Sequence, residues 1–168
     1  MNLPVFDDLL NIAEIASVFL GFTVFVSALT PSKLDILRIT GAAIGSALVI
    51  ILCLLPILFR TYSDDAGFVI RVSSAIWIVL NISVTVAMAK FTPGFVESQR
   101  EDKLGATFVW FLEAAVYLFL ILSALQFWPN LSVTLFFAAV FALVLQAIFF
   151  FITLTLSISN KESTNSSS

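Results

Sequence analysis

Residues 114–160 read AAVYLFLILSALQFWPNLSVTLFFAAVFALVLQAIFFFITLTLSISN, and none of these 47 residues is charged. A single α-helix of this length would extend for about 70 Å, more than twice the roughly 30 Å of a bilayer's hydrocarbon core. The stretch must therefore turn back on itself. Trp128-Pro129-Asn130 marks the turn, because proline stops a helix and tryptophan favours the membrane interface.

The composition of the whole chain agrees with a membrane protein. Of the 168 residues, 60% are apolar and 11% are charged, and 18 are Phe. An ordinary soluble domain has about 45–50% apolar and about 25% charged residues. A water-soluble monomer of this size could not bury so much apolar surface. The net charge of −3 and the lack of a basic patch exclude a nucleic-acid partner, so the expected partner is the lipid bilayer.

Three further uncharged stretches, residues 15–32, 39–59 and 72–89, are each long enough to cross a membrane. The sequence therefore predicts an all-α integral membrane protein, a bundle of five transmembrane helices. The expected spans are about 9–30, 34–59, 67–90, 104–127 and 131–158. Residues 1–159 form a single transmembrane domain, and residues 160–168 are expected to be a mobile polar tail.

The basic residues predict which way round the bundle lies. With five spans, six basic residues share one side of the membrane with the C-terminus, and only Arg60 and Arg71 lie on the other. Basic residues concentrate in cytoplasmic loops, which predicts an outside N-terminus and a cytoplasmic C-terminus. The six are Lys33, Arg38, Lys90, Arg100, Lys103 and Lys161. Four spans with an interfacial first helix are the alternative, and charge counting alone does not separate the two.

Four ionisable residues fall inside the predicted spans, where each costs at least about 2.5–3.5 kcal/mol on insertion scales. They sort by depth into an outer pair, Glu14 and Arg71, and an inner pair, Arg38 and Glu113. They are interpreted first as interhelical fasteners or as edge charges that reach the interface. The alternatives are a proton- or ion-linked role for Glu113 with Tyr117, one turn further on, and a contact with a lipid headgroup or partner.

Two amides, Asn81 in the third span and Gln146 in the fifth, also lie deep in the predicted bundle. Each can form a hydrogen bond to a neighbouring helix, worth about 0.6 kcal/mol on average. A packing contact is the first interpretation of both residues. A position on a pore or beside a ligand is the alternative.

Small residues at four-residue spacing form two candidate helix-packing faces. Gly41 and Gly45 lie on the second span, and Ala13, Ser17 and Gly21 lie on the first. Such faces let helix backbones approach closely within a membrane. They predict packing within one chain or an interface between subunits.

The residue inventory argues against an enzyme or a cofactor protein. The chain has no histidine, and Cys53 is its only cysteine, so neither histidine-based catalysis nor the usual zinc and haem sites can be built. No glycine-rich phosphate-binding loop is present. We therefore expect no cofactor, no metal and no enzyme activity.

The layout of short loops between five spans is similar to that of small bacterial inner-membrane proteins, and we expect a multi-pass protein of that membrane. No diagnostic motif accompanies this resemblance, so it implies no activity. The expected function is that of a non-catalytic oligomeric or accessory subunit of a membrane complex, which the small-residue faces favour. The alternative is a small ion or proton channel or transporter formed by oligomerisation. In that alternative Glu113 is the titrating group, and Tyr117, Asn81 and Gln146 support it. The subunit is favoured because a conducting path normally needs more polar lining than about one such group per span.

Overall fold

The computed structural model describes the backbone of residues 3–27, 33–91 and 103–165, and the side chains of residues 7–25, 39–91 and 103–153 except 129. Within those ranges the protein is all-helical and contains no strand. Five helices are long and apolar enough to cross a membrane, which confirms the predicted bundle of five spans. They are α1 (Leu3–Ser27), α2 (Lys33–Arg60), α3 (Ala66–Phe91), α5 (Lys103–Leu125) and α6 (Ser132–Asn165).

The helices differ from the predicted spans mainly at their ends. The helix α6 continues to Asn165, past the expected end of the fifth span at residue 158 and into the predicted tail. Polar residues such as those at 159–165 are compatible with a helix that extends beyond the membrane into water. Most of the predicted cytoplasmic loop, residues 92–102, lies outside the described residues.

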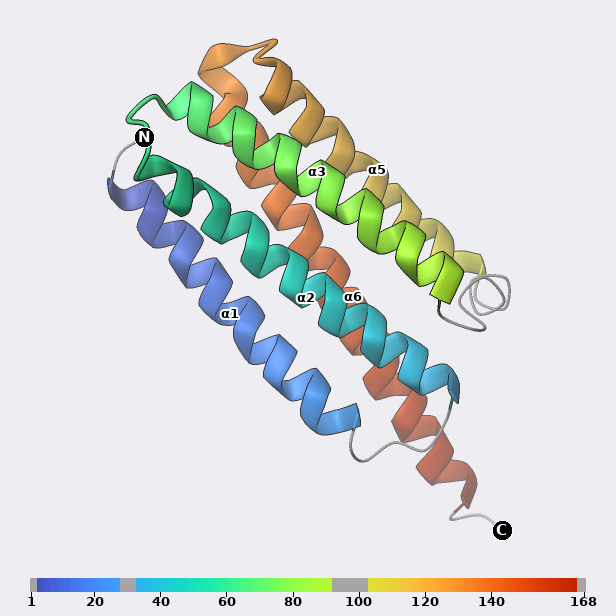
Figure 1. The fold of residues 1–168 in the computed structure, drawn as a ribbon. Helices are drawn as coiled ribbons and strands as arrows, with labels where there is room; N and C mark the ends of the chain where they lie inside the picture. The colour runs from blue at the N-terminus through green and yellow to red at the C-terminus, as the bar shows by residue number, and fades with distance from the viewer. Residues whose placement is uncertain (1–2, 28–32, 92–102, 166–168) are drawn as a thin grey trace.

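The five helices pack as two hairpins joined by a central helix (Figure 1). Helices α1 and α2 lie side by side, α3 packs on α5, and α6 packs against both α2 and α5. The first helix runs along α2 within the bundle and does not lie across the end of it. This arrangement agrees with five spans and not with the alternative of an interfacial first helix.

The interior is filled by apolar side chains from all five helices, among them Leu9, Leu52, Trp77, Leu120 and Phe136. The Trp77 indole Nε1–H donates to the main-chain oxygen of Leu48 over 3.1 Å, which fixes α3 against α2. Lipid tails are as apolar as this core, so close packing and interhelical hydrogen bonds, more than escape from the solvent, stabilise the bundle.

The chain turns between α5 and α6 where the sequence predicts it. After α5 ends at Leu125, Gln126 adopts a φ of 50°, and the 3-10 turn η1 (Pro129–Leu131) leads into α6. The hydroxyl of Ser123 donates to the main-chain oxygen of Ser132 over 2.8 Å. This buried hydrogen bond joins the last turn of α5 to the first turn of α6.

Two phenylalanines of α6 offer a matched test of the packing. Phe136 is 0% exposed and Phe141 is 64% exposed. We expect Phe136→Ala to lower the free energy of unfolding by about 3 kcal/mol, because it leaves a cavity among tightly packed side chains. Phe141→Ala should change it little, since lipid fills the vacated space. Unfolding by sodium dodecyl sulfate in mixed micelles measures both, and equal losses would contradict the packing described here.

Candidate functional site

Four polar side chains from three helices meet inside the bundle. The Asn81 amide nitrogen of α3 donates a hydrogen bond to the Glu113 carboxylate of α5 and lies 3.0 Å from the Tyr117 hydroxyl oxygen. Gln146 of α6 and Tyr117 also hydrogen-bond to Glu113. We call these four residues, Asn81, Glu113, Tyr117 and Gln146, the polar cluster. Glu113 and Tyr117 reach it together because residues four apart share one face of a helix.

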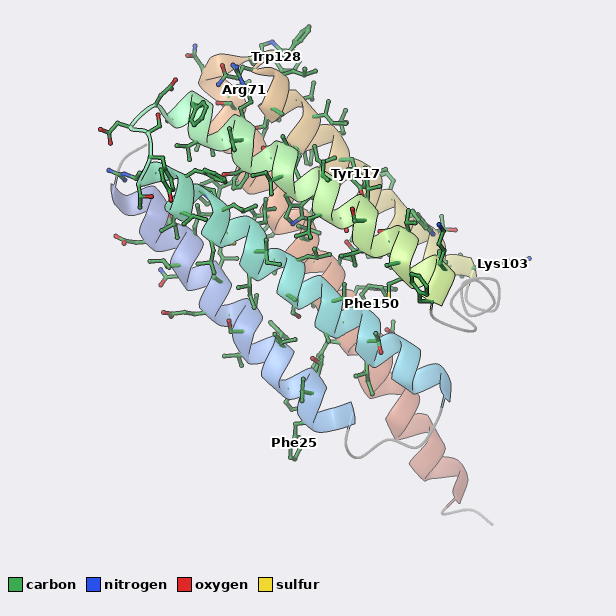
Figure 2. The ribbon with its side chains drawn as sticks, in the orientation of Figure 1. Phe25, Arg71, Lys103, Tyr117, Trp128 and Phe150 are labelled. Carbon is green, nitrogen blue, oxygen red and sulfur yellow. The ribbon has the colours of Figure 1, made fainter. Side chains whose placement is uncertain are left out.

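The polar cluster is deep in the bundle. Asn81 is 3% exposed and Glu113 is 9% exposed. Glu113 lies ten residues after Lys103, the first residue of α5, which places it about 15 Å along the helix and near the middle of a hydrocarbon core of about 30 Å. Figure 2 shows Tyr117 between Lys103 at one end of the bundle and Arg71 and Trp128 at the other.

The donors around Glu113 are all neutral. Two amides and a phenol bond to the carboxylate, and none of them carries a positive charge. Hydrogen bonds to an ionised group are stronger than those between neutral groups, so the cluster offsets part of the cost of ionising the carboxyl group in a medium of low polarity. One acceptor is left over, because the Gln146 Oε1 atom is buried and has no hydrogen-bond partner.

A cavity of about 120 Å³ lies beside the polar cluster, between α2, α3, α5 and α6. Asn81, Glu113 and Gln146 line it together with apolar side chains. It extends from the cluster toward the end of the bundle that carries Lys90 and Lys103, where Met88 and Phe150 line it. By the distribution of basic residues, this end is the predicted cytoplasmic one.

The two glycines of α2 contribute differently to this cavity. A Cβ atom at Gly41 would meet the Phe150 ring at 3.6 Å, an ordinary contact, so α6 packs closely on α2 at this level. A Cβ atom at Gly45 would meet nothing within 4 Å. Gly45 therefore leaves space within the wall of the cavity, whereas Gly41 provides a contact between helices.

Glu14 and Arg71, which were predicted to pair because they lie at similar depth, are not part of the polar cluster. The Arg71 guanidinium donates to the Gln126 side-chain oxygen over 2.7 Å, near the turn that follows α5. Glu14 is exposed on α1. The side chain of Arg38, the predicted partner of Glu113, lies outside the described residues.

The small-residue face of α1 points partly inward and partly outward. Ala13 is buried in the core, and the Ser17 hydroxyl donates to its main-chain oxygen over 2.8 Å. Ser17 and Gly21 are exposed, and a Cβ atom at Gly21 would meet nothing within 4 Å. Only Ala13 of the three is therefore packed within the chain.

Sequence reasoning did not single out the apolar wall of the cavity, notably Met88, Trp110 and Phe150. Residues of these types are numerous in every span, so nothing in the sequence distinguishes those that face a cavity from those that face lipid. Gln126, which accepts from Arg71, was also missed. Its place after the last turn of α5 was a usable signal, because polar residues at helix ends lie near interfacial charges.

Among the described residues, no group of three or more Cys, Asp, Glu or His side chains is placed to hold a metal ion. Comparison with protein families, curated proteins and solved structures finds no match to this chain. The arrangement of the polar cluster and its cavity is therefore the basis for assigning a function.

A double-mutant cycle tests whether the polar cluster is energetically coupled. We expect Asn81→Ala and Glu113→Ala to show an interaction energy of about 1 kcal/mol in unfolding, because each removes the other's hydrogen-bond partner. Ser83 of α3 is the control, since its hydroxyl donates to the main-chain oxygen of Val79 on its own helix. Ser83→Ala combined with Glu113→Ala should be additive. Additivity of the first pair as well would show that the cluster is not coupled.

Proposed function

We propose that this polytopic helical membrane protein is a small proton-linked transporter or channel in which Glu113 is the titrating group. The observation that supports the proposal is the convergence of Asn81, Tyr117 and Gln146 on the Glu113 carboxylate beside a cavity. Each of these polar groups is costly at its depth, and together they form a site within one chain. A conducting or carrying site needs such a group where the substrate passes.

We infer that the surroundings of Glu113 provide partners for both of its protonation states. When the carboxylate is ionised, the side chains of Asn81, Tyr117 and Gln146 donate to it. When it is protonated, its own hydroxyl becomes a donor, and the Gln146 Oε1 atom is a buried acceptor without a partner. A group with partners in both states can load and release a proton without leaving a buried polar atom unsatisfied.

The proposal includes a non-enzymatic role and a cellular location. The polar cluster is proposed to carry protons and not to catalyse a reaction, and the connections between the described helices are short. We place the protein in a bacterial inner membrane with the N-terminus outside and the C-terminus in the cytoplasm. The concentration of basic residues on one side supports this orientation.

Proton flux into liposomes tests the proposal. In vesicles with a trapped pH-sensitive dye, a potassium diffusion potential set by valinomycin should drive proton entry in the presence of the wild-type protein. Glu113→Gln should reduce entry to the level of protein-free vesicles, because the amide keeps the shape of the side chain and cannot carry the proton.

Glu14→Gln is the matched control, since it makes the same chemical change at an exposed carboxylate of α1. It should leave the flux unchanged. Equal flux through wild type and Glu113→Gln, or none above protein-free vesicles in either, would refute the assignment to Glu113.

A second candidate function, an oligomeric or accessory subunit, is favoured by the outer face of α1. Asn11, Glu14 and Ser17 are exposed there, within a helix that is apolar enough to span the membrane. A charged side chain that faces lipid costs at least about 2.5–3.5 kcal/mol, and a neighbouring protein surface with hydrogen-bond donors would reduce that cost.

Native mass spectrometry of the protein released from membranes tests this second function. If the protein is such a subunit, the wild type is released with a second copy or another membrane subunit, and Glu14→Leu is released alone. Val18→Leu, an apolar change on the same exposed side of α1, should retain the assembly. A wild-type protein released only as single chains would exclude the subunit role for this face.

A further inference from the structure

We propose that the cavity beside Glu113 binds a small organic cation that carries N–H donors, of the guanidinium or alkylammonium type. This inference rests on the proposed function, because it uses the same carboxylate. It adds the chemical class of the substrate, which proton movement alone leaves open. Three properties of the cavity support it: its charge, its walls and its size.

The charge and hydrogen-bonding pattern favour a cationic donor. Glu113 lines the cavity beside Asn81 and Gln146. A carboxylate at the wall of a cavity calls for a ligand that is positively charged and has several N–H groups. The neutral donors of the cluster satisfy part of the carboxylate's hydrogen bonding and none of its charge.

The walls favour an organic ion over a metal ion. Beyond the polar end, the cavity is lined by apolar and aromatic side chains, including Leu48, Met88, Trp110 and Phe150. Metal ions such as Mg²⁺ and Ca²⁺ take about six to eight oxygen ligands, which these walls do not supply. A guanidinium is weakly hydrated and stacks on aromatic faces, and an alkylammonium has an apolar stem.

The volume suits a ligand of a few atoms. The cavity measures about 120 Å³, slightly less than an engineered apolar cavity of about 150 Å³ that holds benzene. A ligand of about five non-hydrogen atoms therefore fits. Methylguanidinium is of this size, and its planar N–H fork matches a carboxylate.

The cation and the proton compete for one group. Among the described side chains that line the cavity from α2, α3, α5 and α6, Glu113 alone is ionisable, and Tyr117 is the neighbouring phenol. Binding of the cation to a protonated Glu113 releases one proton and leaves the net charge of the site unchanged. Binding therefore weakens as the pH falls, because the proton concentration rises while the ligand stays charged.

Calorimetric titration of the purified full-length protein in lipid nanodiscs tests the ligand class. Methylguanidinium should bind with saturation. Methylurea, a neutral molecule of nearly the same shape, should not bind, because it lacks the charge. Tetramethylammonium, which has the charge without N–H donors, should bind more weakly than methylguanidinium. Equal binding of methylguanidinium and methylurea would show that the cavity does not recognise charge and would overturn the inference.

Two pairs of variants locate the binding. Glu113→Gln should weaken methylguanidinium binding by about tenfold or more, since the charged acceptor is lost, and Glu14→Gln should not. Gly45→Leu should block binding by filling the cavity, whereas Gly21→Leu adds the same side chain at another open glycine, on the exposed side of α1. Circular dichroism and a single elution peak establish that each variant is folded.

The outcome is separable from that of the proposed function. Proton flux that depends on Glu113, together with no saturable binding of methylguanidinium to the wild type, would refute the cation site and leave the proton-linked role standing. Binding that persists unchanged in Glu113→Gln or in Gly45→Leu would place the ligand elsewhere and refute the cation site as well.

Discussion

A carboxylate near the middle of a lipid bilayer must be met by hydrogen-bond donors, and the placement of Glu113 depends on this requirement. One donor comes from α3, one from α6, and one from α5, the helix that carries Glu113 itself. These three helices must therefore keep a fixed rotation and depth relative to one another. Apolar packing in a membrane allows many relative positions of the helices, because one lipid-like side chain can replace another. The polar cluster supplies the specificity that packing alone lacks.

Other hydrogen bonds between helices, outside the polar cluster, help to hold the helices at this rotation and depth. The Trp77 indole, one turn from Asn81 on α3, bonds to α2. The Ser123 hydroxyl joins α5 to α6 at the turn between them, and Arg71 bonds to Gln126 from α3. These contacts lie on the side of the polar cluster away from Lys90 and Lys103. The cavity extends from the level of Leu48 toward the opposite end of the bundle.

The sequence was sufficient to predict the five helices and the turn at Trp128, because length, charge and proline act along the chain. It also singled out each member of the polar cluster, since an ionisable or amide side chain is rare at such depth. Apart from Glu113 and Tyr117, which are one turn apart on the same helix, it did not predict which of them meet. Depth follows from counting residues, but neighbours also depend on the rotation of each helix, and that rotation is set by packing over many weakly distinctive residues. Glu14 and Arg71 illustrate the difference: similar expected depth did not bring them together, because Arg71 bonds to Gln126 and Glu14 is exposed.

The open space beside Glu113 is itself informative. Protein interiors are packed to a uniform density, yet the helices leave about 120 Å³ beside the carboxylate unfilled by side chains. At Gly45 a larger side chain would fill part of the space without a steric clash, since a Cβ atom there meets nothing within 4 Å. The structure thus combines two features at one level of the membrane, a carboxyl group without a cationic partner among the described residues and volume that side chains leave unfilled. A small cation pairs with the carboxylate and fills the volume at once, whereas a proton only neutralises the carboxylate.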